Sequence, residues 1–166
     1  MQNIAGVGLG LRRELIDDYL QAEHVPDFIE VAPENWLGLG GRHAKQFAAC
    51  VERTALFCHG LSLSIGGPYP LNLEFIGQIK QFLKQHQALL YSEHLSYTHD
   101  GGYLYDLLPI PMTEEAVDYV AERILKVQDL LGQRLVIENV STYAMPAAEM
   151  TEAEFVCAVL QAADCE

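Results

Sequence analysis

Residues 88–95 read Ala88-Leu89-Leu90-Tyr91-Ser92-Glu93-His94-Leu95, a short apolar run that ends in polar residues. A strand with apolar residues on both faces is typical of a parallel sheet that helices cover. Four further apolar runs lie at residues 4–11, 28–31, 55–65 and 135–140. The sequence therefore predicts five buried strands.

Amphipathic segments separate these apolar runs. Apolar residues within segments 15–22, 44–51, 73–83, 117–131 and 155–163 recur at the spacing of one helix face, which predicts a helix in each segment. Residues that commonly cap helices stand at the predicted ends: Asn72, Thr113, Thr151 with Glu154, and Gly132. Residues 96–111 are expected to form a long connection.

The alternation of strand and helix, repeated five times, predicts an α/β fold with a parallel sheet. An open doubly wound sheet and a (β/α) TIM barrel both show this alternation. A complete eight-unit barrel usually needs about 250 residues, whereas this chain has 166. We therefore expect residues 1–166 to form a single partial barrel domain, the N-terminal five β/α units of an eight-unit barrel.

The composition excludes several classes of partner. A net charge of -13 argues against binding nucleic acid through a basic patch and against docking on anionic membranes. The sequence contains no run of about 18 apolar residues, so no membrane span is expected. Residues 1–10 lack the basic start and the cleavage site of a signal peptide, so a cytoplasmic location is expected.

The four cysteines show no C-x-x-C spacing that would suggest a zinc cluster. Without an export signal, they are expected to be reduced thiols. Cys50 and Cys157 are expected on buried helix faces, and Cys58 is expected to be a small buried hydrophobe.

Polar residues gather at the predicted C-terminal ends of the strands, where (β/α) barrels build their active sites. They are Glu34, Asn35, His59, Glu93, His94, Glu138 and Asn139. Burying an unpaired carboxylate in an apolar strand is costly, and a divalent metal ion would offset that cost.

Two imidazoles and one carboxylate, from His59, His94 and Glu138, form a donor set that suits iron, manganese or zinc. A lone histidine in an apolar strand is more often a hydrogen-bonded core residue, and Glu138 could instead pair with Arg134. Such residues at three successive strand ends favour the metal site. Trp36 is expected to pack at the barrel rim.

Six motifs occur in order along the chain: residues 6–12 (GVGLGLR), 30–35 (EVAPEN), 59–67 (HGLSLSIGG), 92–96 (SEHLS), 106–111 (DLLPIP) and 137–143 (IENVSTY). Together they resemble the multinuclear non-haem iron oxidases, long catalogued as an uncharacterised family of xylose-isomerase-like TIM barrels. The resemblance covers nearly the whole chain. It implies an enzyme that binds two or three iron ions and uses O2 to modify cysteine residues of a ribosomally made precursor peptide, which a partner protein presents.

The resemblance also implies roles for the polar residues. His59, His94 and Glu138 would bind iron, with Glu138 able to bridge two ions. Glu138 and Glu93 are the candidate catalytic residues. The residues expected to lie behind the ligands or to contact substrate are Glu34, Asn35, Glu93 and Asn139.

Chains of that family continue beyond a segment similar to Ala163-Asp164-Cys165 into strands that carry further ligands. Complete metal loading and activity are therefore expected to need those strands, and a second copy of the chain could cover open sheet edges. Two other functions stay open: a zinc- or manganese-dependent hydrolase or sugar isomerase on the same barrel, and an inactive fragment or partner-binding remnant.

Overall fold

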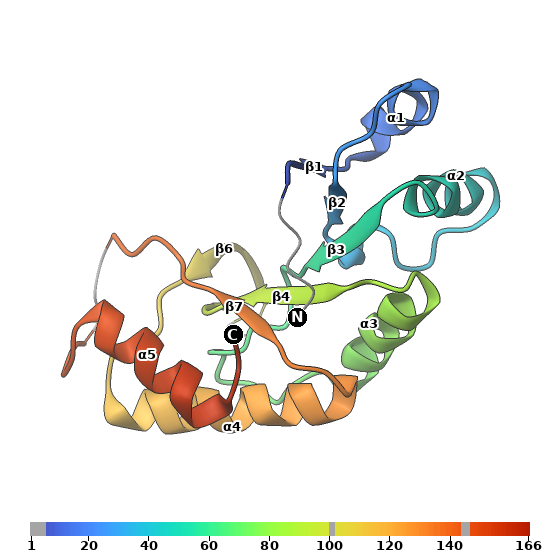
Figure 1. The fold of residues 1–166 in the computed structure, drawn as a ribbon. Helices are drawn as coiled ribbons and strands as arrows, with labels where there is room; N and C mark the ends of the chain where they lie inside the picture. Colours follow the sequence, from blue (N-terminus) through green and yellow to red (C-terminus); the bar gives the residue numbers. More distant parts are fainter. Residues whose placement is uncertain (1–5, 100–101, 144–146) are drawn as a thin grey trace.

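The computed structural model describes residues 6–99, 102–143 and 147–166. Its main sheet has five parallel strands in the order β1-β2-β3-β4-β7 (Figure 1). These strands are β1 (Gly8–Gly10), β2 (Phe28–Val31), β3 (Ala55–His59), β4 (Leu90–His94) and β7 (Val136–Glu138). Neighbours in the sheet follow one another along the chain, apart from the inserted pair β5 and β6, as in a (β/α) barrel.

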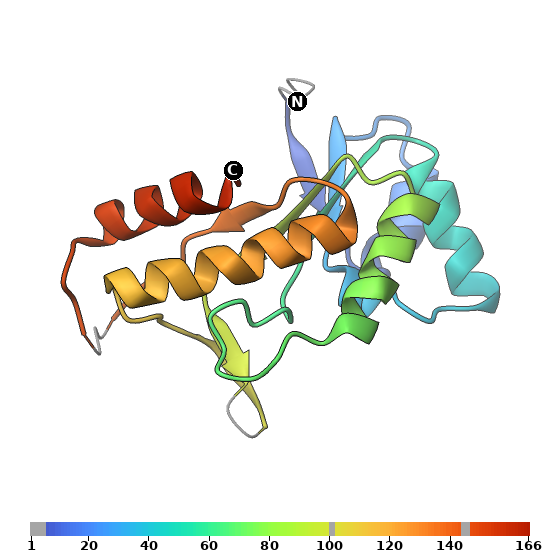
Figure 2. The same cartoon turned by 90° about the horizontal axis from the view of Figure 1, so that it is seen from below.

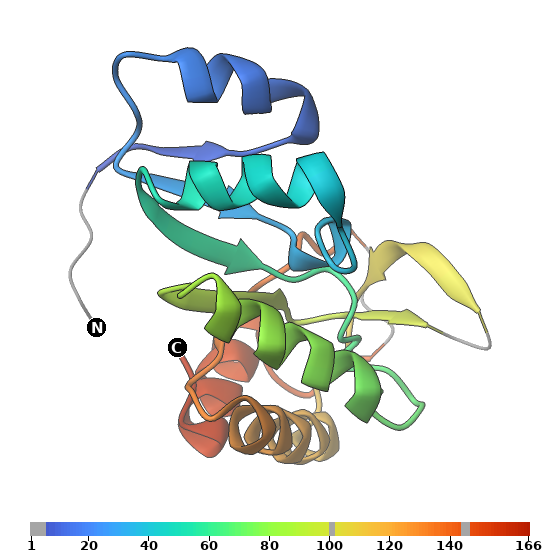
Figure 3. The same cartoon turned by 90° about the vertical axis from the view of Figure 1, so that its right-hand side faces the viewer.

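Helices connect the strands and line the outer side of the curved sheet (Figures 2 and 3). They are α1 (Ile16–Gln21), α2 (Gly41–Val51), α3 (Leu73–Gln85), α4 (Glu114–Leu131) and α5 (Glu152–Ala163), with short 3-10 turns η1 (Arg13–Leu15) and η2 (Pro33–Asn35). The predicted α/β alternation and partial barrel are confirmed. No helix in the described part of the chain is long and apolar enough to cross a membrane.

The helix caps lie where the sequence predicts them. The side chains of Asn72 and Thr113 accept the backbone N–H groups of Phe75 at 3.0 Å and Ala116 at 3.2 Å. Thr151 forms the full capping box that begins α5. Gly132 ends α4 with a φ of 79°, a left-handed conformation that favours glycine.

The third strand is shorter than the predicted run 55–65, because its pairing with β4 ends one residue beyond His59. The next backbone donors turn away from the sheet: Leu61 N–H donates to the Glu34 carboxylate and Leu63 N–H donates to the Glu93 carboxylate. The first, fourth and fifth strands are also shorter than predicted, and residues 4–5 lie outside the described residues.

The connection expected over residues 96–111 contains a feature that the prediction lacked. β5 (Tyr97–His99) and β6 (Tyr103–Leu108) form an antiparallel pair that projects from the end of β4. β5 has only three residues, and β6 (YLYDLL) is apolar or aromatic except at Asp106, so neither strand shows a clear alternation of polar and apolar residues.

Alternation along the strands divides the side chains between two faces. Ile29, Leu56 and Tyr91 point toward the helices and are almost fully buried. The positions between them face the inner side of the sheet. Paired residues of parallel strands point the same way, so the register His59–Ser92 and His94–Glu138 places these four side chains on that inner face.

Two of the three predictions about buried cysteines are confirmed and one is wrong. Cys50 and Cys58 are buried, as predicted, whereas Cys157 is exposed and its placement in the core was wrong. The buried stripe of α5 consists of Phe155, Val159 and Ala163, and Cys157 lies two residues from Phe155, on the opposite side of the helix.

Candidate metal centre

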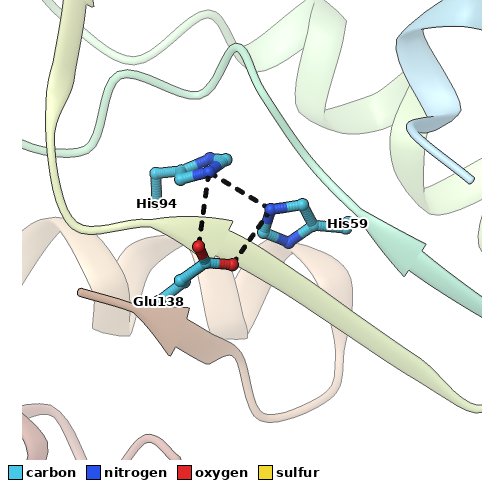
Figure 4. A group of neighbouring side chains, drawn as sticks. All are labelled: His59, His94 and Glu138. Carbon is cyan, nitrogen blue, oxygen red and sulfur yellow. Dashed lines mark hydrogen bonds and ion pairs between the residues drawn. The ribbon is translucent and has the colours of Figure 1, made fainter. Parts of the chain in front are cut away.

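His59, His94 and Glu138 lie together at the C-terminal ends of β3, β4 and β7 (Figure 4). The Nε2 atom of His59 is 3.2 Å from Nε2 of His94 and 3.2 Å from Oε2 of Glu138. The Nε2 atom of His94 is 3.9 Å from Oε1 of Glu138. The structure therefore brings the three predicted ligands together.

These separations fit one divalent metal ion. Ligand bonds of about 2.1 Å at angles of about 90–110° separate two donor atoms by about 3.0–3.4 Å. Two of the three separations, both 3.2 Å, lie within that range. Each residue offers one ligand atom, and all the ligand atoms lie within 4.8 Å of one another.

The hydrogen bonds behind the two histidines turn their Nε2 lone pairs toward the cluster. His94 Nδ1 lies 3.1 Å from the Gly60 carbonyl oxygen, which can only accept, so Nδ1 carries the proton. His59 Nδ1 lies 2.7 Å from the Ser92 hydroxyl, which in turn donates toward the Cys58 carbonyl at 3.5 Å. Such support of the distal ring nitrogen is typical of metal-binding histidines.

The cluster needs a cation for electrostatic reasons. Two Nε2 lone pairs and a carboxylate that face one another repel unless a proton or a metal ion lies between them. The pKa of His94 is raised above its usual value, chiefly by the hydrogen bond with the Glu93 side chain, although burial opposes this. A metal ion bound by Nε2 of His94 would replace the proton that this nitrogen carries when the imidazole is charged.

Glu93 supports the ligands from the outer side of β4. The residue is buried, at 1% exposure, and its carboxylate accepts N–H groups from His94 at 2.9 Å and Leu63 at 3.0 Å. The Tyr91 hydroxyl lies 3.5 Å away. A buried carboxylate at this position is thus tied to the loop after β3, and its catalytic role stays a prediction.

Glu34 holds the same loop from the side of β2. Its Oε1 atom accepts the Leu61 N–H at 2.7 Å, and its Oε2 atom is buried without a partner among the described residues. Burial raises the pKa of Glu34, and the hydrogen bond from Leu61 opposes that rise. Glu34 and Glu93 therefore both hold the loop that follows His59, and their role in the site stays a prediction.

Asn35 and Asn139 are exposed and make contacts other than with the three ligands. The carbonyl of Asn35 accepts a hydrogen bond from Arg13, and the amide of Asn139 donates to Glu152 at 3.0 Å. Their part in binding substrate stays a prediction.

The competing role for Glu138, an ion pair with Arg134, is wrong. Arg134 instead lies 2.8 Å from Asp164 and 3.1 Å from Glu166. Burial, reinforced by the charges of Glu34 and Glu30, raises the pKa of Cys58 to about 12, which disfavours the thiolate form.

Trp36 packs as expected, with its ring 4.4 Å from that of Phe47. The prediction omitted Ser92 and the Gly60 carbonyl. Period-two counting back from His94 would have placed Ser92 on the ligand face. The contact with Gly60 depends on the register between two strands, which one sequence does not reveal.

Comparison with known proteins identifies relatives of the whole described chain. The model of a family described as "RiPP precursor modification enzyme MbnB/TglH/ChrH" matches residues 6–166. A UPF0276 protein from Acinetobacter baylyi is 75% identical over 166 residues, which cover 100% of this chain and 58% of that protein. A UPF0276 protein from Shewanella loihica is 58% identical over 168 residues, covering 99% of this chain and 60% of that protein.

A solved structure shares the fold. The D-psicose 3-epimerase of Clostridium cellulolyticum H10, described with D-tagatose, superposes with a TM-score of 0.62 at 14% identity, covering 93% of this chain and 60% of that one. Such low identity supports the barrel architecture alone. The chain spans about three fifths of the length of the curated relatives that it matches.

Proposed function

Since the chain belongs to the family of RiPP precursor modification enzymes MbnB/TglH/ChrH, we propose that the complete protein is an iron-dependent oxidase. It uses O2 to modify cysteine residues of a ribosomally made precursor peptide, with a partner protein that presents the peptide. The convergence of His59, His94 and Glu138 carries this proposal. Two imidazoles and a carboxylate form the donor set of many non-haem iron oxygenases.

The residues of this chain would hold and orient the reacting groups. His59 and His94 would bind iron through Nε2, while Ser92 and the Gly60 carbonyl fix the orientation of the rings. Glu138 is more exposed, at 58% of its side chain, so its second oxygen is accessible to another ion. Iron bound there would supply the redox chemistry by which O2 oxidises the cysteine.

The further ligands of a multinuclear centre would come from the part of the longer protein that this chain does not span. The relatives are longer than this chain, and three donors leave coordination positions open for additional protein ligands, for O2 or for substrate. We also propose that the protein acts in the cytoplasm.

The direct test is an oxidation assay on the full-length protein. Protein loaded with Fe2+ under anaerobic conditions is mixed with a cysteine-containing precursor peptide and its presenting partner, and O2 is then admitted. We expect the peptide mass to change only when both iron and O2 are present. Glu138→Gln should abolish the change, whereas the exposed control His43→Ala should leave it intact.

Other outcomes separate the alternatives. If a zinc- or manganese-loaded protein converts a sugar or cleaves a bond without consuming O2, the isomerase or hydrolase is correct. If the iron-loaded protein leaves every precursor peptide unchanged in O2, the oxidase proposal is wrong.

A further inference from the structure

A cavity of about 610 Å³ opens directly beside the ligand cluster. His59 lines it, together with Gly10 of β1, Glu30 of β2 and the arginines that follow β1, Arg12 and Arg13. The cavity therefore continues from the metal ligands across the inner side of β3, β2 and β1. A molecule whose reacting atom lies at the ligand cluster would extend into it.

Glycine at the inner position of β1 leaves this part of the cavity open. Gly10 pairs with Glu30 in the sheet and so shares its inner face. A β-carbon added at Gly10 would have no heavy atom within 4 Å. The other inner glycine differs, because a β-carbon at Gly8 would lie 2.0 Å from the Phe28 ring. Gly10 thus opens the cavity without being needed for packing.

Two guanidinium groups at this cavity stand out in a chain with 10 Lys and Arg against 23 Asp and Glu. Arg13 is held in place, since it donates to the Asn35 carbonyl and lies 5.9 Å from the centre of the Trp36 ring. Arg12 is exposed and, among the described residues, makes no ion pair within 4.0 Å, although Glu14 and Glu30 line the same cavity. Its donors are therefore accessible to a ligand.

We infer that Arg12 binds a carboxylate of the substrate peptide, next to the residue that reacts at the ligand cluster. A guanidinium presents paired N–H donors that match the two oxygens of a carboxylate. Glu30, which also lines the cavity, would accept a backbone N–H of the same peptide. The carboxylate belongs either to an acidic side chain or to the C-terminus of the peptide. This inference rests on the proposed function, because it takes a peptide as the substrate.

The test measures binding separately from oxidation. Three serine peptides are titrated calorimetrically into the metal-loaded full-length protein: acetyl-Gly-Ser-Gly with a free carboxylate, its C-terminal amide, and acetyl-Asp-Ser-Gly amide. Serine replaces cysteine so that no sulfur–metal bond or oxidation contributes. We expect at least one acidic peptide to bind about tenfold more tightly than the neutral amide, and the preferred peptide identifies the source of the carboxylate.

Substitutions then assign that preference to the cavity. Arg12→Gln should reduce the ratio of the affinities for the acidic peptide and the neutral amide to nearly one. Arg42→Gln, which removes an equal charge from an exposed site on α2, should leave this ratio unchanged. Gly10→Leu should weaken binding of the acidic peptide by filling the cavity, and it serves as the second variant if Arg12→Gln loses metal or does not fold. A preference that survives both Arg12→Gln and Gly10→Leu overturns the inference, as does equal binding or no binding of all three peptides by the unmodified protein.

The precursor peptide with its presenting partner, assayed for mass change with iron and O2 as described above, reports on the proposed function independently. Acid preference that depends on Arg12, without oxidation, would reject the oxidase and keep the carboxylate site. Oxidation of the peptide without a preference for acidic peptides would support the oxidase and reject the carboxylate site.

Discussion

His59 and His94 owe their orientation to one hydroxyl and one carbonyl. The Ser92 hydroxyl lies 2.7 Å from Nδ1 of His59, and the Gly60 carbonyl lies 3.1 Å from Nδ1 of His94. Both contacts leave Nε2 free to face Glu138. The ligand positions could be predicted from polar residues at the strand ends, but these supporting contacts could not, because they depend on the register of β3 against β4.

Replacing Ser92 should weaken the site without removing a ligand. Ser92→Ala takes away the partner of His59 Nδ1, so we expect the affinity for the metal ion to fall by about 10–100-fold. Competition with a chromophoric chelator measures this affinity on the full-length protein. The exposed Ser141→Ala is the matched control and should bind as the wild type does. Equal affinity in the Ser92 variant would show that the contact does not orient the ring.

Metal affinity should also fall as the pH is lowered. A protonated histidine cannot bind a metal ion, and the raised pKa of His94 means that protons compete from above the usual titration range of histidine. The stability of the metal-free protein should change with pH in the opposite direction. Protonated His94 stabilises the fold at low pH, and this stability is lost as the pH rises through the raised pKa of His94. Chelator competition and thermal unfolding across pH 5–8 measure the two trends. Affinity that does not change with pH would contradict the proposed ligand.

Among the elements, the segment between β3 and α3 departs most from the sequence-based prediction. Its apolar composition predicts a strand that continues to Ile65, yet the backbone leaves the sheet after Gly60. The carboxylates of Glu34, in η2 after β2, and of Glu93, on β4, accept the N–H groups of Leu61 and Leu63 in this segment. Periodicity describes local patterns and does not contain such contacts between distant residues.

Gly60 allows the close approach of this segment to β4. A β-carbon there would lie 2.4 Å from the hydroxyl of Tyr91, which is fully buried, and 2.7 Å from Oε2 of Glu93. We expect Gly60→Ala to destabilise the protein by about 1–3 kcal/mol and to weaken metal binding, because the carbonyl that supports His94 would shift. Gly77→Ala on α3, where nothing lies within 4 Å, should instead stabilise by about 0.5–1 kcal/mol. Chemical denaturation compares the two, and unchanged stability of Gly60→Ala would refute the close packing.

For the whole molecule, the sheet is a curved section of a barrel whose inner face carries the ligand cluster (Figure 3). The outer edge of β7 already has a partner, since Ile137 N–H donates to the Glu166 carbonyl at 2.6 Å and Glu166 N–H donates to the Leu135 carbonyl at 3.0 Å. This alternation is the pattern of a parallel ladder. In the longer relatives, we expect the chain after the corresponding residue to continue as the next strand of the barrel.

The fold was predictable at this scale because each strand, helix and cap favours the same architecture. Apolar strands alternate with amphipathic helices, and Asn72, Thr113 and Thr151 begin helices where the periodicity does. The β5–β6 pair was missed because β5 has only three residues and β6 does not alternate between polar and apolar residues.

Elemental analysis of the full-length protein, purified anaerobically from iron-supplemented cells, tests the metal site most directly. We predict stoichiometric iron in the wild type, a lower iron content in His94→Ala, and the wild-type content in the surface control His43→Ala. Wild-type protein without bound iron, or a His94→Ala variant that keeps its full iron content, would contradict the assignment of His59, His94 and Glu138 as an iron site.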